Sequence, residues 1–407
     1  MRVRIPKRVA VCCLCALLSI LPLMFINVQK HSSPLPSSGD VIRSDDVIMP
    51  EDNDGDHLLR FTSPYIRDHD EETEAAAQKG SAKRSGNNGK HSERTKTVAW
   101  FGEGFRERFK DDHPFERCPV SDCSFLASED ASKADAVLFR GVDGREMPPP
   151  RSHARQVYVL YDMEPPMHVT EKYWTDEWNG VFNWTWNFRR DADIWEPTNY
   201  LRPTKSPPPK TFFLELAEKK SKPVAWFVSD CGAVSRRDDY VRELQRHIAV
   251  DVFGSCGNLS CPRLPQEICF NMLTEQYFFY LSFENALCRD YVTEKFFNKF
   301  TPGVHVLPIV LGGANYSQFF PKGSFIDVAW FAHPKDLAQY MKNLMTDKAT
   351  YAELLWRKAH LQKSGRGSQA AVCELCKRLH DLDTYGKRYD NIKTWRFDGQ
   401  CFPPEWF

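Results

Sequence analysis

The stretch Phe278-Phe-Tyr-Leu-Ser-Phe-Glu-Asn-Ala-Leu-Cys-Arg-Asp-Tyr-Val-Thr-Glu-Lys295 carries the strongest structural signal in this chain. Its first part is aromatic and apolar, which is typical of a strand buried inside a sheet. Polar side chains follow that strand directly, at Glu284, Asn285, Tyr291, Glu294 and Lys295. In α/β folds, ligands bind at the carboxyl ends of the strands. The stretch therefore predicts the floor of a site for a charged ligand that has an aromatic part.

Strand and helix patterns alternate on both sides of this stretch. The sequence predicts a folded body that starts near Thr97, one helix over 237–248, and buried strands at 136–139, 157–161, 224–228, 250–253, 278–283 and 306–311. Such alternation is typical of parallel sheets with helices on both faces. The Pro-rich stretch 202–209 divides the pattern into two α/β halves, and a cleft between two halves is a frequent ligand site.

The N-terminus predicts a membrane anchor. Arg2, Arg4, Lys7 and Arg8 precede an uncharged run over 9–28. That run suits one crossing of a hydrocarbon core of roughly 30 Å, and the basic flank is expected to stay cytoplasmic. A cleaved signal peptide is the alternative, but its apolar region would be about 7–15 residues and would end in small residues.

The stretch over 29–96 is rich in Ser, Asp, Glu, Lys, Gly and His, and it predicts a disordered stem. The predicted organisation is therefore a cytoplasmic tail (1–8), a transmembrane signal anchor (9–28), the stem, an N-terminal domain (97–215), a C-terminal domain (216–360) and a C-terminal segment (361–407). The formal net charge is zero, so bulk charge gives no indication of a nucleic-acid partner.

Cysteine usage agrees with an oxidising lumen. Three of the thirteen cysteines lie in the apolar run, and the other ten form an even set that favours disulfides, with the pairing left open. The CxxC pair Cys373 and Cys376 could also suggest zinc or redox chemistry, although no second pair of ligands accompanies it. The N-glycosylation sequons begin at Asn183, Asn258 and Asn315.

Three positively charged residues are candidates for binding a diphosphate. Arg236 and Arg237 lie at a strand-to-helix turn, where backbone N–H groups and the helix dipole favour anions and an Arg can grip a phosphate with two nitrogens. Lys295 could neutralise a phosphate while its neighbour Glu294 accepts from sugar hydroxyls. The competing interpretations are a solvated Arg face and a capped helix start with a surface Glu-Lys pair.

Glu164 is the candidate general base. It follows the strand at 157–161, and the prolines after it stiffen the turn, which suits a carboxylate that faces a cleft. Asp162 is a competitor, and an exposed loop acid is the alternative to any catalytic role. The triplet Asp191-Ala-Asp193 could hold a metal against a nucleotide diphosphate, but it follows Phe188-Arg-Arg190 rather than a buried strand, so no metal site is predicted.

The motifs at 279–285 and 290–295 resemble the signature of the Golgi α1,3-fucosyltransferases of glycosyltransferase family 10. The resemblance runs from about Val98 to His380 and includes 188–194, 224–229 and 333–338. Within that family, 250–257, 261–263 and 373–380 look most like invertebrate enzymes that fucosylate the innermost GlcNAc of N-glycans. Departures at Phe188, at 196–200 and at Ala286 lie on or near the acceptor side, and they bear on acceptor choice.

The resemblance implies a GT-B fold, in which two Rossmann-like domains face each other across a cleft and the C-terminal one holds GDP-fucose. It implies that Glu164 is the catalytic base. The donor-binding residues it implies are Arg237 (or Arg236), Glu284, Asn285, Tyr291, Glu294 and Lys295. It also implies disulfides that join Cys118 and Cys123 to Cys373 and Cys376, without fixing which pairs with which. Cys256 and Cys261 are further disulfide candidates.

The predicted function is a type II Golgi membrane enzyme that moves L-fucose from GDP-β-L-fucose to O3 of GlcNAc with inversion. The predicted acceptor is the innermost GlcNAc of a glycoprotein N-glycan, and no nucleic-acid partner is predicted. The alternatives are antennal GlcNAc in LacNAc or LacdiNAc, and an inactive sugar-binding membrane protein. No cofactor is required, although added Mn²⁺ could stimulate by assisting the leaving group. The oligomeric state is left open.

Overall fold

The computed structural model describes residues 62–67, 94–101, 113–141, 149–168, 174–262, 265–365 and 367–405. The predicted cytoplasmic tail (1–8), the predicted anchor (9–28) and most of the predicted stem lie outside these residues. Among the helices that the structure describes, none has both the length and the apolar character needed to cross a bilayer.

The N-terminal lobe is built on a six-stranded parallel sheet in the order β2-β1-β3-β4-β5-β6. Its strands are β1 (Lys96–Trp100), β2 (Cys123–Phe125), β3 (Ala136–Arg140), β4 (Val157–Asp162), β5 (Trp184–Asn187) and β6 (Ile194–Trp195). Side chains alternate between two cores. Val159 and Tyr161 face a core shared with helix α10 (Ser368–His380), whereas Tyr158 and Leu160 face one shared with α12 (Ile392–Phe397). Both faces of this sheet are therefore covered.

The C-terminal lobe holds a second, five-stranded parallel sheet in the order β12-β11-β10-β8-β9. Its strands are β8 (Lys222–Phe227), β9 (Val250–Phe253), β10 (Tyr277–Phe283), β11 (Leu307–Leu311) and β12 (Ile326–Asp327). Every residue of the central strand β10 is buried, as its continuous apolar sequence predicted. A short antiparallel pair, β7 (Leu201–Pro203) and β13 (Leu361–Lys363), completes the strands described.

Helices cover both faces of the second sheet. One core joins it to α3 (Lys210–Lys219), α4 (Arg237–Leu244), α8 (Pro334–Thr346) and α9 (Lys348–Ala359). The other cores involve α5 (Gln266–Gln276), α6 (Glu294–Phe297) and α7 (Tyr316–Phe319). The predicted mixed α/β fold with parallel sheets is thus confirmed. The helix predicted over 237–248 ends four residues early, because the N–H groups of Arg246 and His247 bond three residues back rather than four.

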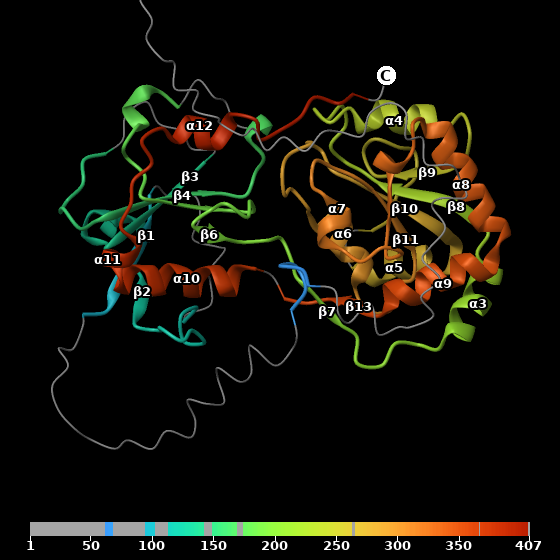
Figure 1. The fold of residues 1–407 in the computed structure, drawn as a ribbon, viewed down its shortest axis with the longest axis horizontal. Helices are drawn as coiled ribbons and strands as arrows, with labels where there is room; N and C mark the ends of the chain where they lie inside the picture. The colour runs from blue at the N-terminus through green and yellow to red at the C-terminus, as the bar shows by residue number, and fades with distance from the viewer. Residues whose placement is uncertain are drawn as a thin grey trace, which may run out of the picture. The chain divides into compact units, whose positions relative to one another are not determined.

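The C-terminal segment returns to the first lobe. In Figure 1, the last helices of the chain, drawn in red, lie beside the strands β1 to β4, and α10 packs into the same core as β1. The short α11 (Leu382–Tyr385) follows α10. Two disulfides fix α10 in this position, Cys118–Cys373 and Cys123–Cys376.

Two predicted boundaries differ from the structure. The boundary at 215/216 falls inside α3, which belongs entirely to the C-terminal lobe through Phe213 and Ala217. The prediction of disorder over 29–96 is wrong for residues 62–67, because Tyr65 is 1% exposed and Ile66 pairs with Leu201. A single aromatic residue in a polar context gave no periodic signal, yet it finds an aromatic pocket in the folded body.

Candidate active site

The carboxyl ends of β8 and β10 form one wall of a pocket in the C-terminal lobe. These neighbouring parallel strands end at the same edge of the sheet, so the residues that follow them meet there. The pocket has a volume of about 520 Å³. Its lining combines polar groups with aromatic rings: Phe227, Val228, Ser229, Asp230, Arg237, Phe253, Gly254, Cys261, Pro262, Gln266, Cys269, Phe270, Tyr280, Asn285, Glu294, Lys295, Asn298 and Lys299.

Lys295 enters this pocket from the helical turn that follows β10. Its Nζ lies 3.2 Å from Glu284 Oε2 and donates to Thr293 Oγ1 at 2.9 Å. Burial alone would lower the pKa of Lys295, but the carboxylates of Glu284 and Glu294 outweigh burial and raise it. Lys295 is therefore a fixed positive charge in the pocket, as a diphosphate site requires.

Glu284 holds this turn together from beneath. Its side chain is fully buried, and its carboxylate accepts from Thr293 N at 2.8 Å and from Thr293 Oγ1 at 2.8 and 3.0 Å. Burial raises the pKa of Glu284, and the nearby Lys295 opposes that rise. Glu284 was predicted beside the donor residues. The structure places it behind Lys295 and Thr293, where it positions them, rather than on the pocket surface.

The two arginines of the strand-to-helix turn have different positions. Arg236 adopts a left-handed backbone conformation with φ of 52°, and its exposed side chain pairs with Asp239 at 2.7 Å. Arg237 is 2% exposed and lines the pocket. Its guanidinium donates to Phe283 O at 2.9 Å and to Asp230 O at 2.8 Å. Arg237 thus ties together the ends of β8 and β10, and it is the arginine that can present a charge to a ligand there.

Tyr291 connects the pocket to the N-terminal lobe. Its hydroxyl donates to Asn285 Oδ1 at 3.3 Å, and Asn285 in turn donates to Asp230 Oδ2 at 3.4 Å. The Tyr291 ring packs on Phe188, with ring centres 4.9 Å apart. Burial raises the pKa of Tyr291, and the negative charges of Glu284 and Glu164 add to that rise.

Glu164 stands at the end of β4 in the N-terminal lobe. Its side chain is 55% exposed, Oε2 lies 3.5 Å from His168 Nδ1, and its backbone N–H donates to Asp162 Oδ1 at 3.1 Å. The preceding residue, Met163, packs in the cluster that contains Phe188 and Tyr291. The carboxylate of Glu164 contributes to the raised pKa of Tyr291, and it remains accessible to an incoming substrate.

Asp162, the other candidate for the general base, is paired with a buried arginine. Its carboxylate is 4% exposed and contacts the buried guanidinium of Arg396 from α12. Its backbone carbonyl accepts from Asn187 Nδ2. A Cβ added at Gly141 would collide with this carboxylate, so the pair is closely enclosed. Asp162 supports the loop that carries Glu164 and does not face solvent.

The triplet Asp191-Ala-Asp193 does not gather into a metal site. Asp191 is bound by Arg189, whereas Asp193 accepts from Tyr389 at 2.7 Å and pairs with Lys387 at 2.7 Å. Within the described residues, one His/Cys/Asp/Glu group has metal-like proximity, Cys123 with Cys376 and His380. Its two cysteines are joined to each other in a disulfide, so they offer no thiolate to a metal.

All ten cysteines outside the apolar N-terminal run are paired. The candidate Cys256 bonds to Cys231, and the candidate Cys261 bonds to Cys269 at the rim of the pocket. Sequence order did not suggest the fifth bridge, Cys288–Cys401, which joins the loop after β10 to the C-terminal end of the chain. The predicted presence of disulfides is confirmed.

The three sequons differ in accessibility. Asn258 and Asn315 are exposed, and Asn315 also caps α7 by accepting from Gln318 N at 3.1 Å. Asn183 is held by its own side chain, which accepts from Tyr158 N and donates to Lys387 O, each at 2.9 Å. Glycosylation at Asn183 would break the hydrogen bond from its side-chain nitrogen to Lys387 O. No such bond of the side-chain nitrogen is present at Asn258 or Asn315 among the described residues.

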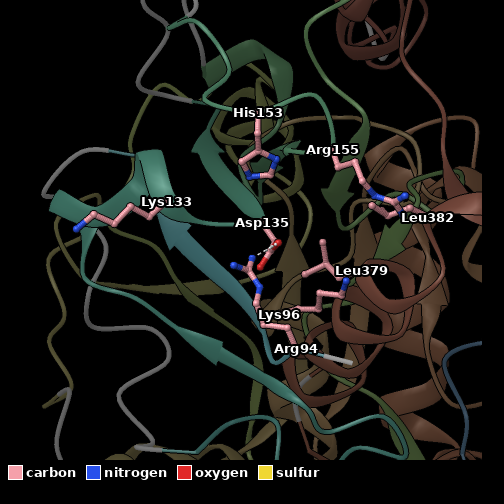
Figure 2. Close-up of a pocket in the computed structure, with 8 residues that line it drawn as sticks. All are labelled: Arg94, Lys96, Lys133, Asp135, His153, Arg155, Leu379 and Leu382. Carbon is pink, nitrogen blue, oxygen red and sulfur yellow. Dashed lines mark hydrogen bonds and ion pairs between the residues drawn. The ribbon is translucent and has the colours of Figure 1, made fainter. Parts of the chain in front are cut away.

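A second pocket lies in the N-terminal lobe at the start of its strands, and its charges are mostly positive. Figure 2 shows Arg94 and Asp135 pointing toward one another, with His153 and Arg155 beyond them. Arg94 Nη2 lies 2.8 Å from Asp135 Oδ1. No residue predicted to act on substrate is among the described residues that line this pocket.

Sequence reasoning missed the aromatic half of the C-terminal pocket. Phe253, Phe270 and Tyr280 lie on three different elements, and their positions in strands and a helix gave no sign that they share a pocket. Asp230 was missed as well, although its position directly after β8 is the same signal that identified Asn285 after β10. Lys299 gave no signal, because a lysine one helical turn beyond Lys295 is usually exposed.

Comparisons with known proteins agree with the resemblance described above. Residues 217–395 match the sequence profile of "Glycosyltransferase family 10 (fucosyltransferase) C-term", and residues 93–199 match "Fucosyltransferase, N-terminal". The "Alpha-(1,3)-fucosyltransferase C" of Drosophila melanogaster is 36% identical over 310 residues, which are 69% of this chain and 70% of that protein.

Two further relatives are similar over less of their own length. The "Glycoprotein 3-alpha-L-fucosyltransferase A" of Drosophila melanogaster is 36% identical over 71% of this chain and 58% of its own. The "Alpha-(1,3)-fucosyltransferase fut-1" of Caenorhabditis elegans is 34% identical over 59% of this chain and 54% of its own. A solved structure, "Crystal Structure of alpha1,3-Fucosyltransferase with GDP-fucose", aligns with a TM-score of 0.49 and 17% identity, covering 75% of this chain and 96% of that one. On the sequence matches, the chain belongs to glycosyltransferase family 10, the fucosyltransferases, and the predicted class of enzyme, an α1,3-fucosyltransferase, is confirmed.

Proposed function

We propose that this protein transfers L-fucose from GDP-β-L-fucose to O3 of a GlcNAc residue, with inversion at the anomeric carbon. The observation that carries the proposal is the pocket at the ends of β8 and β10, which holds Arg237 and Lys295 beside several aromatic rings. A nucleoside diphosphate needs positive charge for its phosphates and flat apolar surface for its base. The pocket offers both within about 520 Å³, a volume in the usual range for such ligands.

Glu164 is the proposed general base. As the acceptor oxygen bonds to C1 of fucose, the bond from C1 to the phosphate oxygen breaks, the acceptor proton passes to Glu164, and the electron pair leaves with GDP. This role is supported by the accessible carboxylate of Glu164 and by the packing of its neighbour Met163 in the cluster that contains Tyr291, because Tyr291 also contacts the pocket through Asn285. General-base groups typically contribute about 10²–10⁴-fold in rate.

Arg237 and Lys295 are proposed to stabilise the charge that develops on the departing GDP. Both are held in place before any ligand arrives, Arg237 by two backbone carbonyls and Lys295 by Glu284. Preorganised charges of this kind are the most effective way to lower a barrier, and losing one typically costs about 100-fold or more in rate. The scheme requires no metal, although Mn²⁺ could assist the leaving group.

The proposed architecture is of the GT-B type, with the two lobes facing across a cleft, the donor in the C-terminal lobe and the acceptor on the N-terminal side. We further propose a type II Golgi membrane protein, with residues 9–28 as the anchor and the catalytic body in the lumen. The disulfide pairing of the body supports an oxidising compartment.

The proposed acceptor is the innermost GlcNAc of N-glycans. The support is that the sequence over 250–257, 261–263 and 373–380 resembles invertebrate enzymes that fucosylate this GlcNAc. Antennal GlcNAc in LacNAc or LacdiNAc is the second candidate, because Phe188 and Ala286, which differ from the usual family residues, both pack with Tyr291 at the acceptor side. Incubation of the soluble body with GDP-fucose and defined N-glycans separates the two by the position of the added fucose. Transfer to neither, with intact GDP binding, would indicate a sugar-binding protein instead.

Glu164→Gln tests the assignment of the base. The variant should lose about 10²–10⁴-fold in turnover, while GDP binding stays within about twofold because Glu164 does not line the donor pocket. Glu177→Gln is the matched control, since Glu177 is an exposed acid of the same lobe. A Glu164→Gln enzyme with wild-type turnover would remove the proposed base.

A further inference from the structure

Lys299 is a buried amine in the lining of the donor pocket. It is 2% exposed and lies one helical turn after Lys295, so both side chains reach the same pocket. Its Nζ lies 3.4 Å from the centre of the Tyr280 ring, 5.4 Å from that of Phe270 and 5.9 Å from that of Phe227. Across the part of the chain that the structure describes, no hydrogen-bond acceptor contacts this amine.

Two other buried lysines of this lobe are arranged differently. Lys220 donates to four backbone carbonyls, and Lys358 donates to Val304 O at 2.9 Å. Neither lines the pocket. Of these three buried lysines, Lys299 is the one that lines the pocket and makes no bond to a backbone carbonyl of the described residues.

The chemistry around Lys299 suits the edge of a purine that presents only hydrogen-bond acceptors. The amine covers the buried Tyr280 ring, but the half-buried rings of Phe227 and Phe270 also line the pocket and can accept the flat face of a base. The charged amine itself offers hydrogen-bond donors and no acceptor. Guanine presents two acceptors, O6 and N7, on a single edge, whereas adenine presents an amino donor in place of O6. Burial lowers the pKa of Lys299 to about 7, with the charge of Lys358 as a second cause, so an acceptor at this position would stabilise the charged amine.

We propose that Lys299 is a specificity-determining residue that selects a 6-oxopurine base by donating to its O6/N7 edge. This inference rests on the proposed donor, because it assumes that a nucleoside diphosphate occupies the pocket with its phosphates at Lys295. It goes further in naming the group that distinguishes guanine from adenine, a role that the phosphate-binding residues cannot perform.

The test measures binding of GDP, IDP and ADP to the intact protein by titration calorimetry. IDP keeps O6 and N7 but lacks the 2-amino group of guanine, so it isolates the edge in question. Wild-type protein should bind GDP and IDP at least about tenfold more tightly than ADP, since a hydrogen bond to a charged donor is typically worth about tenfold or more. Lys299→Met keeps the apolar stem of the side chain. It should weaken the binding of GDP and of IDP by the same factor, about tenfold or more, while the affinity for ADP changes less than about threefold.

Lys299→Gln adds a measurement that does not depend on absolute stability. Its amide can accept a hydrogen bond from the adenine amino group. The preference of this variant for GDP over ADP should therefore be smaller than that of the wild type. Lys220→Met is the matched control, a buried lysine removed outside the pocket, and it should leave the ratio of GDP to ADP affinity unchanged.

Three results would overturn the inference. If Lys299→Met or Lys299→Gln keeps the wild-type ratio of GDP to ADP, the selecting group lies elsewhere, and the proposed donor is unaffected. If Lys220→Met changes the ratio as much as Lys299→Met, the effect reflects packing. If the wild-type protein binds no guanine nucleotide and transfers no fucose, the proposed function fails together with the inference.

Discussion

Replacing Lys295 by Met should reduce stability and donor binding by two separate routes. The first route is through Glu284, whose Oε2 lies 3.2 Å from the ammonium and whose side chain is fully buried. The second route is the loss of a positive charge from the donor pocket. A single variant cannot distinguish these routes, so the magnitudes and a second substitution are needed.

The magnitude of the first route follows from the distance between the two charges. At an effective dielectric constant of about 20, unit charges 3.2 Å apart attract by ~5 kcal/mol. Removing one partner of a buried pair typically costs about 3–5 kcal/mol in the free energy of unfolding. For a body of this size we expect the melting temperature to fall by about 5 °C or more.

The stability loss should depend on pH in a defined direction. Burial raises the pKa of Glu284, so the native state binds more protons than the unfolded state just above the usual carboxyl range. Without Lys295 this pKa rises further, and the unfolding free energy of the variant should fall as pH increases from about 4.5. The melting temperature of Lys295→Met should therefore lie closer to that of the wild type at about pH 5 than at about pH 8.

The double variant Glu284→Gln with Lys295→Met separates the two routes. It contains no buried charge at this position, so most of the lost stability should return, whereas GDP affinity should stay about tenfold or more below wild type. Thermal melts and calorimetric titration with GDP provide the two measurements. The reasoning is refuted if GDP affinity recovers together with stability, because Lys295 would then act only by balancing Glu284.

Three further predictions concern stability. Arg396→Met should lower the melting temperature and the turnover number together, because it leaves the buried carboxylate of Asp162 unpaired beneath the loop of the proposed base. Burial lowers the pKa of His305 to about 3, so its native state binds fewer protons than the unfolded state, and unfolding free energy should fall by up to about 1.4 kcal/mol per unit as pH drops from 6.5 toward 3. Removing the bridge between Cys288 and Cys401, 113 residues apart, should cost about 2–4 kcal/mol.

Each of these predictions has a control. His305→Phe should flatten the acid dependence in urea melts, whereas His113→Gln, at an exposed position, should not; equal slopes in both would contradict the burial argument. The Ser variant of both bridge cysteines is compared with wild type under non-reducing conditions, and an unchanged melt would show that the bridge adds nothing. Arg396→Met with a normal turnover number would separate Asp162 from the proposed base.

The features that sequence predicted well are those encoded locally. The strand at 277–283 and the polar residues after it lie in one short stretch, so their pattern alone indicated a buried strand with a site at its end. The same holds for Glu164, which follows β4 directly. Because Asn285 and Lys295 both lie in the stretch that follows β10, local pattern was sufficient to bring them to one pocket.

The features that sequence did not predict depend on contacts between distant segments. Choosing between Arg236 and Arg237 required the left-handed backbone of Arg236, which turns one side chain outward and the other inward. The pairing of Asp162 with Arg396 joins residues far apart in the chain and could not be read from spacing. The aromatic half of the pocket, likewise, forms where β8, β9, β10 and α5 come together.

The short segment 62–67 sets a practical limit on where the protein can be shortened for expression. Tyr65 packs edge-on against Trp195 and at tilted angles against Phe297, Phe319 and Phe320, with ring centres 5.2 to 6.2 Å away. A secreted fragment that begins at the first strand, near residue 94, would leave these rings uncovered and open to self-association. A fragment that begins before Thr62 keeps them capped, and it is the form to use wherever a shortened soluble body is assayed.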